Sequence, residues 1–274
     1  MSRTVTRTLG AAEVTILTDG GVDFPPDLFP GTDEARIGAL LSQAGQTGIR
    51  TNFNAVLVRN GGRVVLLDAG PRDLFGPSCG FLPDALAESG VKPDAVDTLF
   101  ATHLHPDHIA GMVTPDGAAV FPNAELVVPE AERDFWSDES RFEGDTADWA
   151  ALARTVLTAY GNRLRVIGRD AQIAPGLTAF ALPGHTPGHC GWRLDTGGDA
   201  LLHVGDIVHA PDLQVADPEI GIAFDVDAGT ARTTRKRLLD ELATDGALFT
   251  GGHFLHPAFH RVERSGSGYR LVSP

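Results

Sequence analysis

The stretch Thr102-His103-Leu104-His105-Pro106-Asp107-His108 decides how this chain is interpreted. It directly follows residues 96–101, an apolar segment that predicts a buried strand, so the polar residues begin where that strand ends. Pro106 restrains the backbone and argues against a helix through this turn. Three imidazoles and a carboxylate so close together are costly to fold unless something binds them.

The spacing within this stretch indicates two metal-binding positions. Alternate residues at a strand end point to one face, so His103 and His105 can reach one metal ion. Asp107 and His108 lie beyond the turn and can reach a second ion. Imidazole and carboxylate ligands suit zinc, and also iron, manganese or cobalt.

Ligand-type side chains also follow three later strand-like segments. The tight turn Pro183-Gly184-His185-Thr186-Pro187-Gly188-His189 exposes His185, the run Leu201-Leu202-His203-Val204-Gly205-Asp206 ends in Asp206, and Gly251-Gly252 precedes His253. A glycine pair before a histidine suits a close backbone approach to a site. Together with the first stretch, these motifs predict a site at one edge of a sheet sandwich.

Short apolar, β-rich runs alternate with helical patterns along the chain, which indicates a layered α/β fold. The expected strands are 14–17, 55–58, 64–67, 98–101, 126–128, 164–167, 178–182, 201–204 and 247–249. The expected helices are 83–89, 113–116, 130–136 and 227–244, the last with Arg235 on its outer side. We expect residues 22–51 to form a long surface loop with a short helix near 35–41.

Composition excludes several classes of protein. The 274 residues are 42% hydrophobic, enough for a sizeable core, and the formal net charge of −14 disfavours nucleic acid as a partner. We find neither a secretory signal nor an apolar run that would span a membrane, so we expect a cytoplasmic protein. Two cysteines, Cys79 and Cys190, give no disulfide framework.

In sequence order, THLHPDHIAG (102–111), PGHTPGH (183–189), GD (205–206) and GGH (251–253) resemble the metallo-β-lactamase-fold hydrolases. Asp68, in Val64-Val65-Leu66-Leu67-Asp68-Ala69-Gly70, resembles the first motif of that family. The resemblance extends over essentially the whole chain. It implies a four-layered αβ/βα sandwich and one domain over residues 1–274.

The resemblance also implies a dinuclear site that holds two divalent transition metals, with zinc the first choice. His103, His105 and His185 would bind the first ion, Asp107, His108 and His253 the second, and Asp206 would bridge them. Asp68 would orient a ligand histidine. A water molecule shared by both ions would become hydroxide and attack an electrophilic centre, which gives Asp107, Asp206 and Asp68 catalytic roles.

The remaining histidines receive other roles. We expect His189 to stabilise its own turn, His203 to be a core residue, and His209 to line the pocket. His256 and His260 are expected to belong to the C-terminal loop.

Features outside the metal motifs resemble the methyl parathion hydrolase-like and lactonase-like members. They are Asn54, residues 74–77 with Gly80, residues 205–209, residues 225–227 with Ala231 and Arg232, and residues 266–269. That group acts on small neutral esters, lactones or phosphotriesters, so we expect an apolar pocket. Its candidate lining residues are Phe24, Phe29, Phe75, Phe81, Trp136, His209, Phe224 and Phe254.

Other branches fit less well. Nucleases carry an inserted domain and bind polyanions, redox di-iron members replace the first motif, and true β-lactamases lack an aspartate at position 206. A glyoxalase II-like thioesterase shares the full ligand set and stays open as an alternative, although no convincing basic cluster for glutathione stands near the C-terminus. A non-catalytic metal-binding scaffold or sensor is the alternative from another class. A homodimer is also compatible with the sequence.

Overall fold

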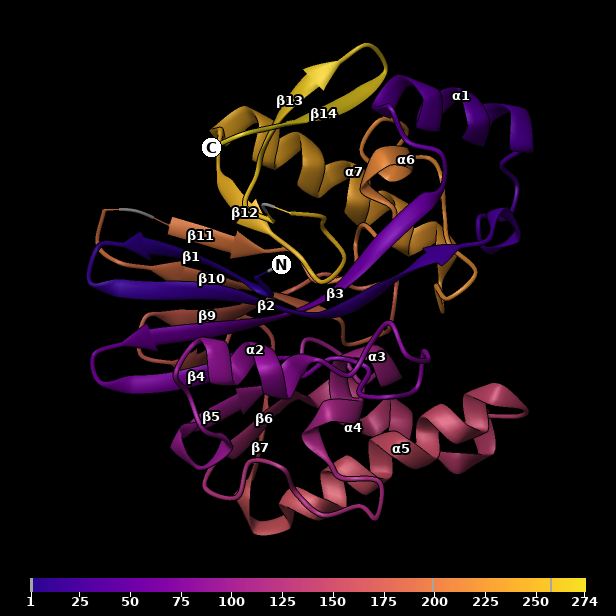
Figure 1. The fold of residues 1–274 in the computed structure, drawn as a ribbon. Coiled ribbons are helices and arrows are strands. Elements are labelled where there is room, and N and C mark those ends of the chain that lie inside the picture. Colours follow the sequence, from indigo (N-terminus) through magenta and orange to yellow (C-terminus); the bar gives the residue numbers. More distant parts are fainter. Residues whose placement is uncertain (1, 199, 257) are drawn as a thin grey trace.

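Two β-sheets face each other in the computed structural model, which describes residues 2–198, 200–256 and 258–274 (Figure 1). The first sheet holds seven strands in sequence order: β1 (Thr4–Leu9), β2 (Ala12–Phe24), β3 (Ile49–Asn60), β4 (Arg63–Leu67), β5 (Thr98–Phe100), β6 (Glu125–Pro129) and β7 (Leu164–Ile167). Strands β1 to β4 pair antiparallel, and β4 to β7 pair parallel. The switch to parallel pairing places the ends of β4 and β5 at the same edge.

The second sheet holds five strands in the order β12-β11-β10-β9-β8. They are β8 (Gln172–Ala174), β9 (Leu177–Ala181), β10 (Cys190–Asp195), β11 (Ala200–His203) and β12 (Leu248–Thr250), and only β11 and β12 pair parallel among them. A separate hairpin, β13 (Arg261–Ser265) and β14 (Gly268–Val272), lies near the C-terminus.

Helices cover the outer faces of both sheets, and the family's four-layered αβ/βα sandwich is confirmed (Figure 1). The helices α1 (Glu34–Ala44), α6 (Pro211–Gln214) and α7 (Ala228–Asp245) lie in the upper half of the view. The lower half contains α2 (Leu82–Glu88), α3 (Pro106–Ile109), α4 (Glu130–Ser137) and α5 (Asp145–Tyr160). None of the helices in the described residues is long and apolar enough to cross a membrane.

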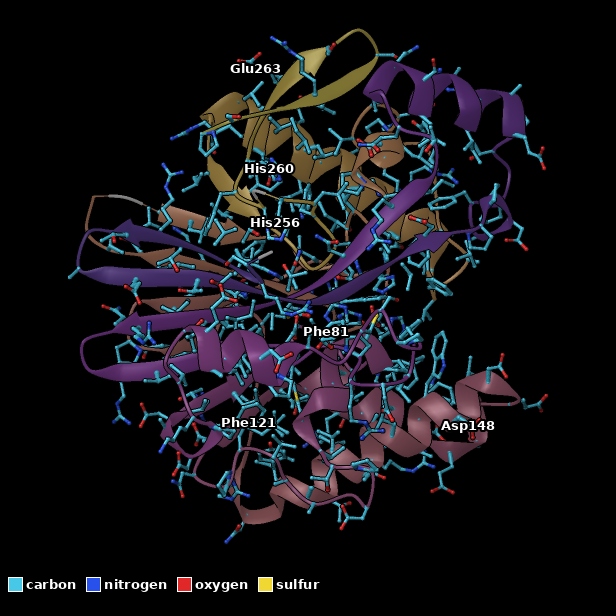
Figure 2. All side chains as sticks on the ribbon, viewed as in Figure 1. Phe81, Phe121, Asp148, His256, His260 and Glu263 are labelled. Atoms are coloured by element: carbon cyan, nitrogen blue, oxygen red, sulfur yellow. The ribbon has the colours of Figure 1, made fainter. Side chains whose placement is uncertain are left out.

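The strands of the first sheet are apolar on both faces because both faces are covered. In β4, Leu66 packs with the α2 and α5 residues on the helix side, whereas Val65 and Leu67 pack between the two sheets. Figure 2 shows Phe121, which is fully buried, inside the lower half of the molecule. Strands buried on both faces read as continuous apolar runs, which explains why their positions were predictable.

Each of the nine predicted strands is present, but several other predictions were wrong. Residues 22–51 are not one loop, since β2 runs to Phe24 and β3 begins at Ile49, with α1 between them. Residues 113–116 form a bridge and a turn instead of a helix. Helix α5 and the strands β1, β8, β10, β13 and β14 were not predicted from the sequence.

Two predictions about single residues were also wrong. Pro106 does not exclude a helix; it begins α3, because the first helical position needs no hydrogen-bonded N–H. Arg235 is not on the outside of α7 but fully buried. Its guanidinium donates to the carbonyls of Ile207, Pro218 and Ile220, which compensates its burial.

Candidate metal centre

Four chain segments deliver the predicted ligands to one edge between the sheets. His103, His105, Asp107 and His108 follow β5 directly and extend into α3. His185, Asp206 and His253 follow β9, β11 and β12. The structure therefore brings together all seven residues predicted as ligands, as the strand-end pattern implied.

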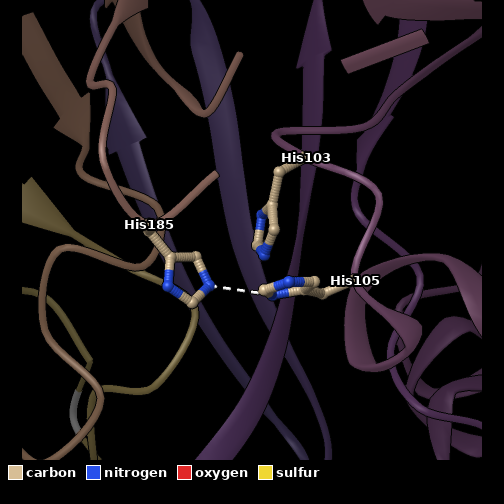
Figure 3. Close-up of side chains that lie close together, drawn as sticks. All are labelled: His103, His105 and His185. Atoms are coloured by element: carbon tan, nitrogen blue, oxygen red, sulfur yellow. Dashed lines mark hydrogen bonds between the residues drawn. The ribbon is translucent and has the colours of Figure 1, made fainter. Parts of the chain in front are cut away.

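The first group consists of three imidazoles, which converge in Figure 3. His105 Nδ1 lies 2.9 Å from His185 Nε2, and the ring of His103 lies above both, with centroid distances of 4.7 and 4.9 Å. All three side chains are buried. His103 Nε2 has no hydrogen-bond partner among the described residues, so a strong ligand atom faces the centre of the group unused.

The second group consists of Asp107, His108, Asp206 and His253. His108 Nε2 lies 3.0 Å and His253 Nε2 2.8 Å from Asp206 Oδ2. Both nitrogens also lie 3.5 Å from Asp107 Oδ2. Two imidazoles and two carboxylates thus point at a common centre.

Asp206 lies between the two groups. Its Oδ2 is 3.7 Å from both His103 Nε2 and His185 Nε2, in addition to its short contacts with the second group. Its Oδ1 has no hydrogen-bond partner in the described part of the chain. Each group's ligand atoms lie within 4.8 Å of one another. Donor type, burial and unpartnered atoms therefore fit two divalent transition metals with Asp206 between them.

Asp68 supports the second group from behind. Its Oδ2 accepts hydrogen bonds from His108 Nδ1 (2.9 Å) and Thr102 Oγ1 (2.9 Å), and its Oδ1 accepts from Thr102 N (2.8 Å). Asp68 has φ 60°, a strained conformation that neighbouring contacts must hold. By accepting a hydrogen bond from Nδ1–H, Asp68 keeps the proton on Nδ1 and leaves Nε2 of His108 to face a metal.

The other ligand histidines are oriented in the same way by different partners. His185 Nδ1 donates to Asp225 Oδ1 (2.9 Å), and His253 Nδ1 donates to the carbonyl of Asn52 (2.8 Å). The Thr102 hydroxyl donates a hydrogen bond to Asp68, so its oxygen accepts a hydrogen bond from His103 Nδ1 at 3.1 Å. Nε2 of His185, His253 and His103 is therefore left for the metal, whereas His105 presents Nδ1 to the first group.

Gly252 allows the close backbone approach that the sequence indicated. A Cβ atom there would lie 2.7 Å from Asp206 Oδ1 and 3.0 Å from His108 Cε1. The backbone of this turn is fixed by Gly252 N, which donates to the Gly205 carbonyl, and by Asn54 N, which donates to the Gly252 carbonyl. A larger residue at 252 would displace the ligands of the second group.

The two groups differ in their protonation. Burial lowers the pKa of the first group's imidazoles, to about 4 for His105 and well below the usual value for His103 and His185. Burial also opposes charge on His108 and His253, but Asp206 and other carboxylates outweigh it and raise the pKa of both. Without metal, the first group therefore resists protonation, whereas the carboxylates favour protonation of the second group's imidazoles.

A cavity of about 70 Å³ opens onto the metal-binding residues. Five aromatic side chains form its apolar wall: Phe24, Phe53, Phe75, Trp149 and Phe224. The polar side contains His105, Asp107, His185, Asp206, His209 and His253, with Pro106 between the two sides. The described residues that line this cavity include no lysine or arginine.

The structure places four candidate lining residues at this cavity, namely Phe24, Phe75, His209 and Phe224. Phe29, Trp136 and Phe254 do not line it: they are buried in three different hydrophobic clusters. Phe81 does not line it either and packs under the guanidinium of Arg3 instead. These aromatic side chains are buried by packing within the protein. A sequence alone does not distinguish an aromatic residue of the core from one that lines a pocket.

Two aromatic residues in the wall of the cavity, Phe53 and Trp149, were not predicted from the sequence. Trp149 lies on α5, which the alanine- and leucine-rich run from 147 to 157 could have indicated. Phe53 lies within β3, where an aromatic residue gives no signal beyond strand propensity.

Four further histidines belong to neither metal-binding group: His189, His203, His256 and His260. His189 donates from Nδ1 to the Leu182 carbonyl and accepts from Asp206 N at Nε2, so it ties its turn to the bridging aspartate. His203 is buried and stacks on Trp192. In Figure 2, His256 and His260 appear near β12, in the C-terminal part of the chain.

The sequence of residues 50–253 matches the model of the metallo-beta-lactamase superfamily. This match covers most of the chain, so the protein belongs to that superfamily. Two solved structures agree in fold over nearly the full length of both chains. Hydrolase AbOPH is 29% identical with a TM-score of 0.92, covering 99% of this chain and 97% of its own. The dizinc quorum-quenching lactonase AidC is 24% identical with a TM-score of 0.93, covering 100% and 98%.

Curated relatives match a smaller part of the chain. An N-acyl homoserine lactonase of Bacillus sp is 25% identical over 170 residues, which are 61% of this chain and 60% of that relative. A hydroxyacylglutathione hydrolase of Stenotrophomonas maltophilia (strain R551-3) is 26% identical over 162 residues, 58% of this chain and 50% of that relative. The chain therefore matches 60% or less of the length of these relatives.

Proposed function

We propose that this protein is a dinuclear metal-dependent hydrolase of small neutral lactones and esters. The observation that carries the proposal is the cavity, in which an aromatic wall faces the two ligand groups and the described lining residues include no lysine or arginine. Anionic substrates need arginine or lysine partners, whereas a neutral acyl group needs only apolar surface and an activated nucleophile.

The ligand set assigns roles to the residues of the site. Two divalent transition metals, zinc as first choice, would supply an activated water nucleophile and polarise the substrate carbonyl. Asp206 would hold both ions and offset their mutual repulsion, and Asp107 would add negative charge to the second group. Asp68 would keep His108 in the correct orientation through the hydrogen bond at its Nδ1.

The aromatic wall and His209 would bind the substrate itself. His209 is buried, its Nε2 lies 3.3 Å from Asp206 Oδ2, and neither ring nitrogen has a hydrogen-bond partner among the described residues. Its ring contacts Asp206 and lines the cavity, where it would bond a substrate oxygen. The cavity is smaller than the roughly 300–1,000 Å³ of pockets for drug-sized ligands, so a lactone ring or short ester fits best.

The relatives support this proposal and supply its alternative. The similarity to an N-acyl homoserine lactonase favours a lactone substrate. The similarity to a hydroxyacylglutathione hydrolase keeps a thioesterase in consideration, but glutathione is anionic and the described cavity offers it no cationic side chain. Phosphotriester hydrolysis is proposed as a side activity. A cytoplasmic location, a single domain over 1–274 and a homodimer stay predictions.

The test is a substrate panel with metal analysis. The full chain is loaded with zinc, manganese or cobalt, and kcat/KM is measured for N-acyl homoserine lactones, simple lactones, aryl esters, a paraoxon-type triester, S-lactoylglutathione and a carbapenem. We expect lactones or aryl esters to give the highest value and the chelated protein to give none. A tenfold advantage for S-lactoylglutathione would establish the thioesterase, and bound metal without any turnover would favour a scaffold or sensor.

The aromatic wall is tested with two matched variants. Phe224 lines the cavity and Phe135 does not, and both are half-buried. Phe224→Ala should raise KM for an acyl lactone by roughly tenfold, since burying a Phe side chain contributes about 1.5–3 kcal/mol. Phe135→Ala should leave KM within a factor of two. Equal KM values in the two variants would remove the cavity from the proposal.

A further inference from the structure

Glu132 is a buried carboxylate that the metal site itself does not use. It is the third residue of α4 and is 0% exposed. Its Oε2 accepts hydrogen bonds from Leu104 N (3.0 Å) and Trp136 Nε1 (2.9 Å), and its Oε1 accepts from Gly188 N (2.8 Å). All three donors are neutral N–H groups.

Two of these donors belong to the loops that carry the first metal-binding group. Leu104 lies between His103 and His105 in the chain, and Gly188 lies three residues after His185. One carboxylate therefore joins the two loops whose histidines must meet, although Leu104 and Gly188 are far apart in sequence. The second group depends less on this link, because two of its four ligands, Asp206 and His253, follow β11 and β12 and lie outside both loops.

The turn at Gly188 is pressed against the start of α4. A Cβ atom on Gly188 would lie 2.5 Å from Glu132 N and 2.9 Å from the Ala131 carbonyl carbon. Only glycine permits this approach, which brings Gly188 N within reach of Glu132. The same loop is tied to the first one where Cys190 N donates to the Thr102 carbonyl (3.0 Å).

The chemical choice of glutamate at this position is informative. Burying a carboxylate among neutral donors costs free energy that a neutral side chain would avoid. However, three N–H groups converge on the two oxygens, and only a side chain with two acceptor oxygens satisfies them all. Glutamine would present an NH₂ group to at least one of these donors and would break that arm of the link.

We propose that Glu132 is a positioning residue for the first metal-binding group, which holds the His103–His105 loop and the His185 loop at the separation that one metal ion requires. The proposal rests on the metal centre of the proposed function but not on the identity of the substrate. Its readout is metal binding, which is independent of turnover.

The experiment measures zinc binding to the full chain by competition with a chromophoric chelator. The variants are Glu132→Gln and Gly188→Ala, and His105→Ala identifies which binding phase belongs to the first group. We expect both test variants to weaken the first-group phase by about tenfold or more, as partners of ligand residues do elsewhere. The second-group phase should stay within about a factor of three.

Tyr160→Phe is the matched control for a loss of stability alone. Tyr160 is buried in the same core cluster as Trp136, and its hydroxyl donates to the Met112 carbonyl (3.0 Å) without touching either loop. Tyr160→Phe should lower the unfolding temperature while leaving both zinc phases unchanged.

Three results would overturn the proposal. One is a folded Glu132→Gln protein with wild-type affinity in both phases, and another is an equal loss of affinity in Tyr160→Phe. If Glu132→Gln does not fold, Gly188→Ala decides, and wild-type binding there rejects the link. Wild-type protein that binds no zinc would instead reject the proposed function together with this inference.

Discussion

The two metal-binding groups meet at Asp206 but are built from different ligands. The first offers three imidazoles, and the second offers two imidazoles and two carboxylates. In the first group, Thr102 orients His103 and the Asp225 carboxylate orients His185, while Glu132 joins the two loops. In the second group, the Asp68 carboxylate orients His108 and the backbone carbonyl of Asn52 orients His253.

The two groups should therefore differ in their affinity for a metal ion and in how strongly protons compete with that ion. A group with two carboxylates attracts a dication more strongly than a neutral group does. The same carboxylates also raise the pKa of His108 and His253, so protons compete with the metal there. The first group has no such competition but depends on the geometry of two separate loops. We therefore expect the two ions to respond differently to mutation and to pH.

Removing the shared ligand should have the largest effect, because it acts on both groups. In Asp206→Asn, the amide carries no charge to offset two cations. We expect zinc content to fall to one ion or fewer per chain. We also expect kcat/KM on the best substrate to fall by about 10³-fold or more, which corresponds to about 4 kcal/mol of transition-state stabilisation. Elemental analysis and steady-state kinetics measure this, and two retained ions would show that the groups are independent.

Single-ligand variants should separate the groups. His105→Ala should remove the first ion and His253→Ala the second, each lowering kcat/KM by at least about 10²-fold because both ions share the activation of water. The unfolding temperature of the metal-free protein should change little, since both side chains serve the site and not the core. If His105→Ala kept turnover within a factor of two, the dinuclear mechanism would be wrong.

Variants of the two carboxylates that orient ligand histidines should show whether each metal ion has its own support. Asp68→Asn changes the partner of His108, and Asp225→Asn changes the partner of His185. Each variant should weaken its own ion by about 10–100-fold and leave the other nearly unchanged. Chelator competition resolves the two phases, and a parallel loss in both phases from either variant would contradict separate support.

The pH dependence of binding should give the smallest effect. The pKa of His105 is lowered to about 4, so the first group is already deprotonated and its affinity should be flat between about pH 6 and about pH 8. His108 and His253 have raised pKa values, so binding there must release protons and the affinity should fall as pH decreases, by about tenfold per unit for each proton displaced. Calorimetry in buffers of different ionisation enthalpy counts the protons. Equal proton release at both groups would contradict the comparison.

The sequence by itself predicted which ligand-type side chains the structure gathers at the edge between the sheets. Each ligand belongs to a short motif that follows an apolar strand, and strands of a sheet that run in the same direction end at a common edge. The identity of the donors and their position in the chain were therefore enough to predict His103, His105, Asp107, His108, His185, Asp206 and His253. The strands were also predictable, because apolar periodicity is a local property of the chain.

Only the tertiary structure decided what surrounds these ligands. Glu132 and Arg235 have sequence contexts typical of exposed helix faces, yet both are buried, because their partners come from distant loops. Trp136 and Trp149 are only 13 residues apart, but one packs in the core and the other lines the cavity. Which aromatic residue meets a substrate, and which carboxylate holds a loop, depends on contacts between segments far apart in the chain. Local pattern carries no information about those contacts, whereas burial and hydrogen-bond satisfaction in the folded chain fix them.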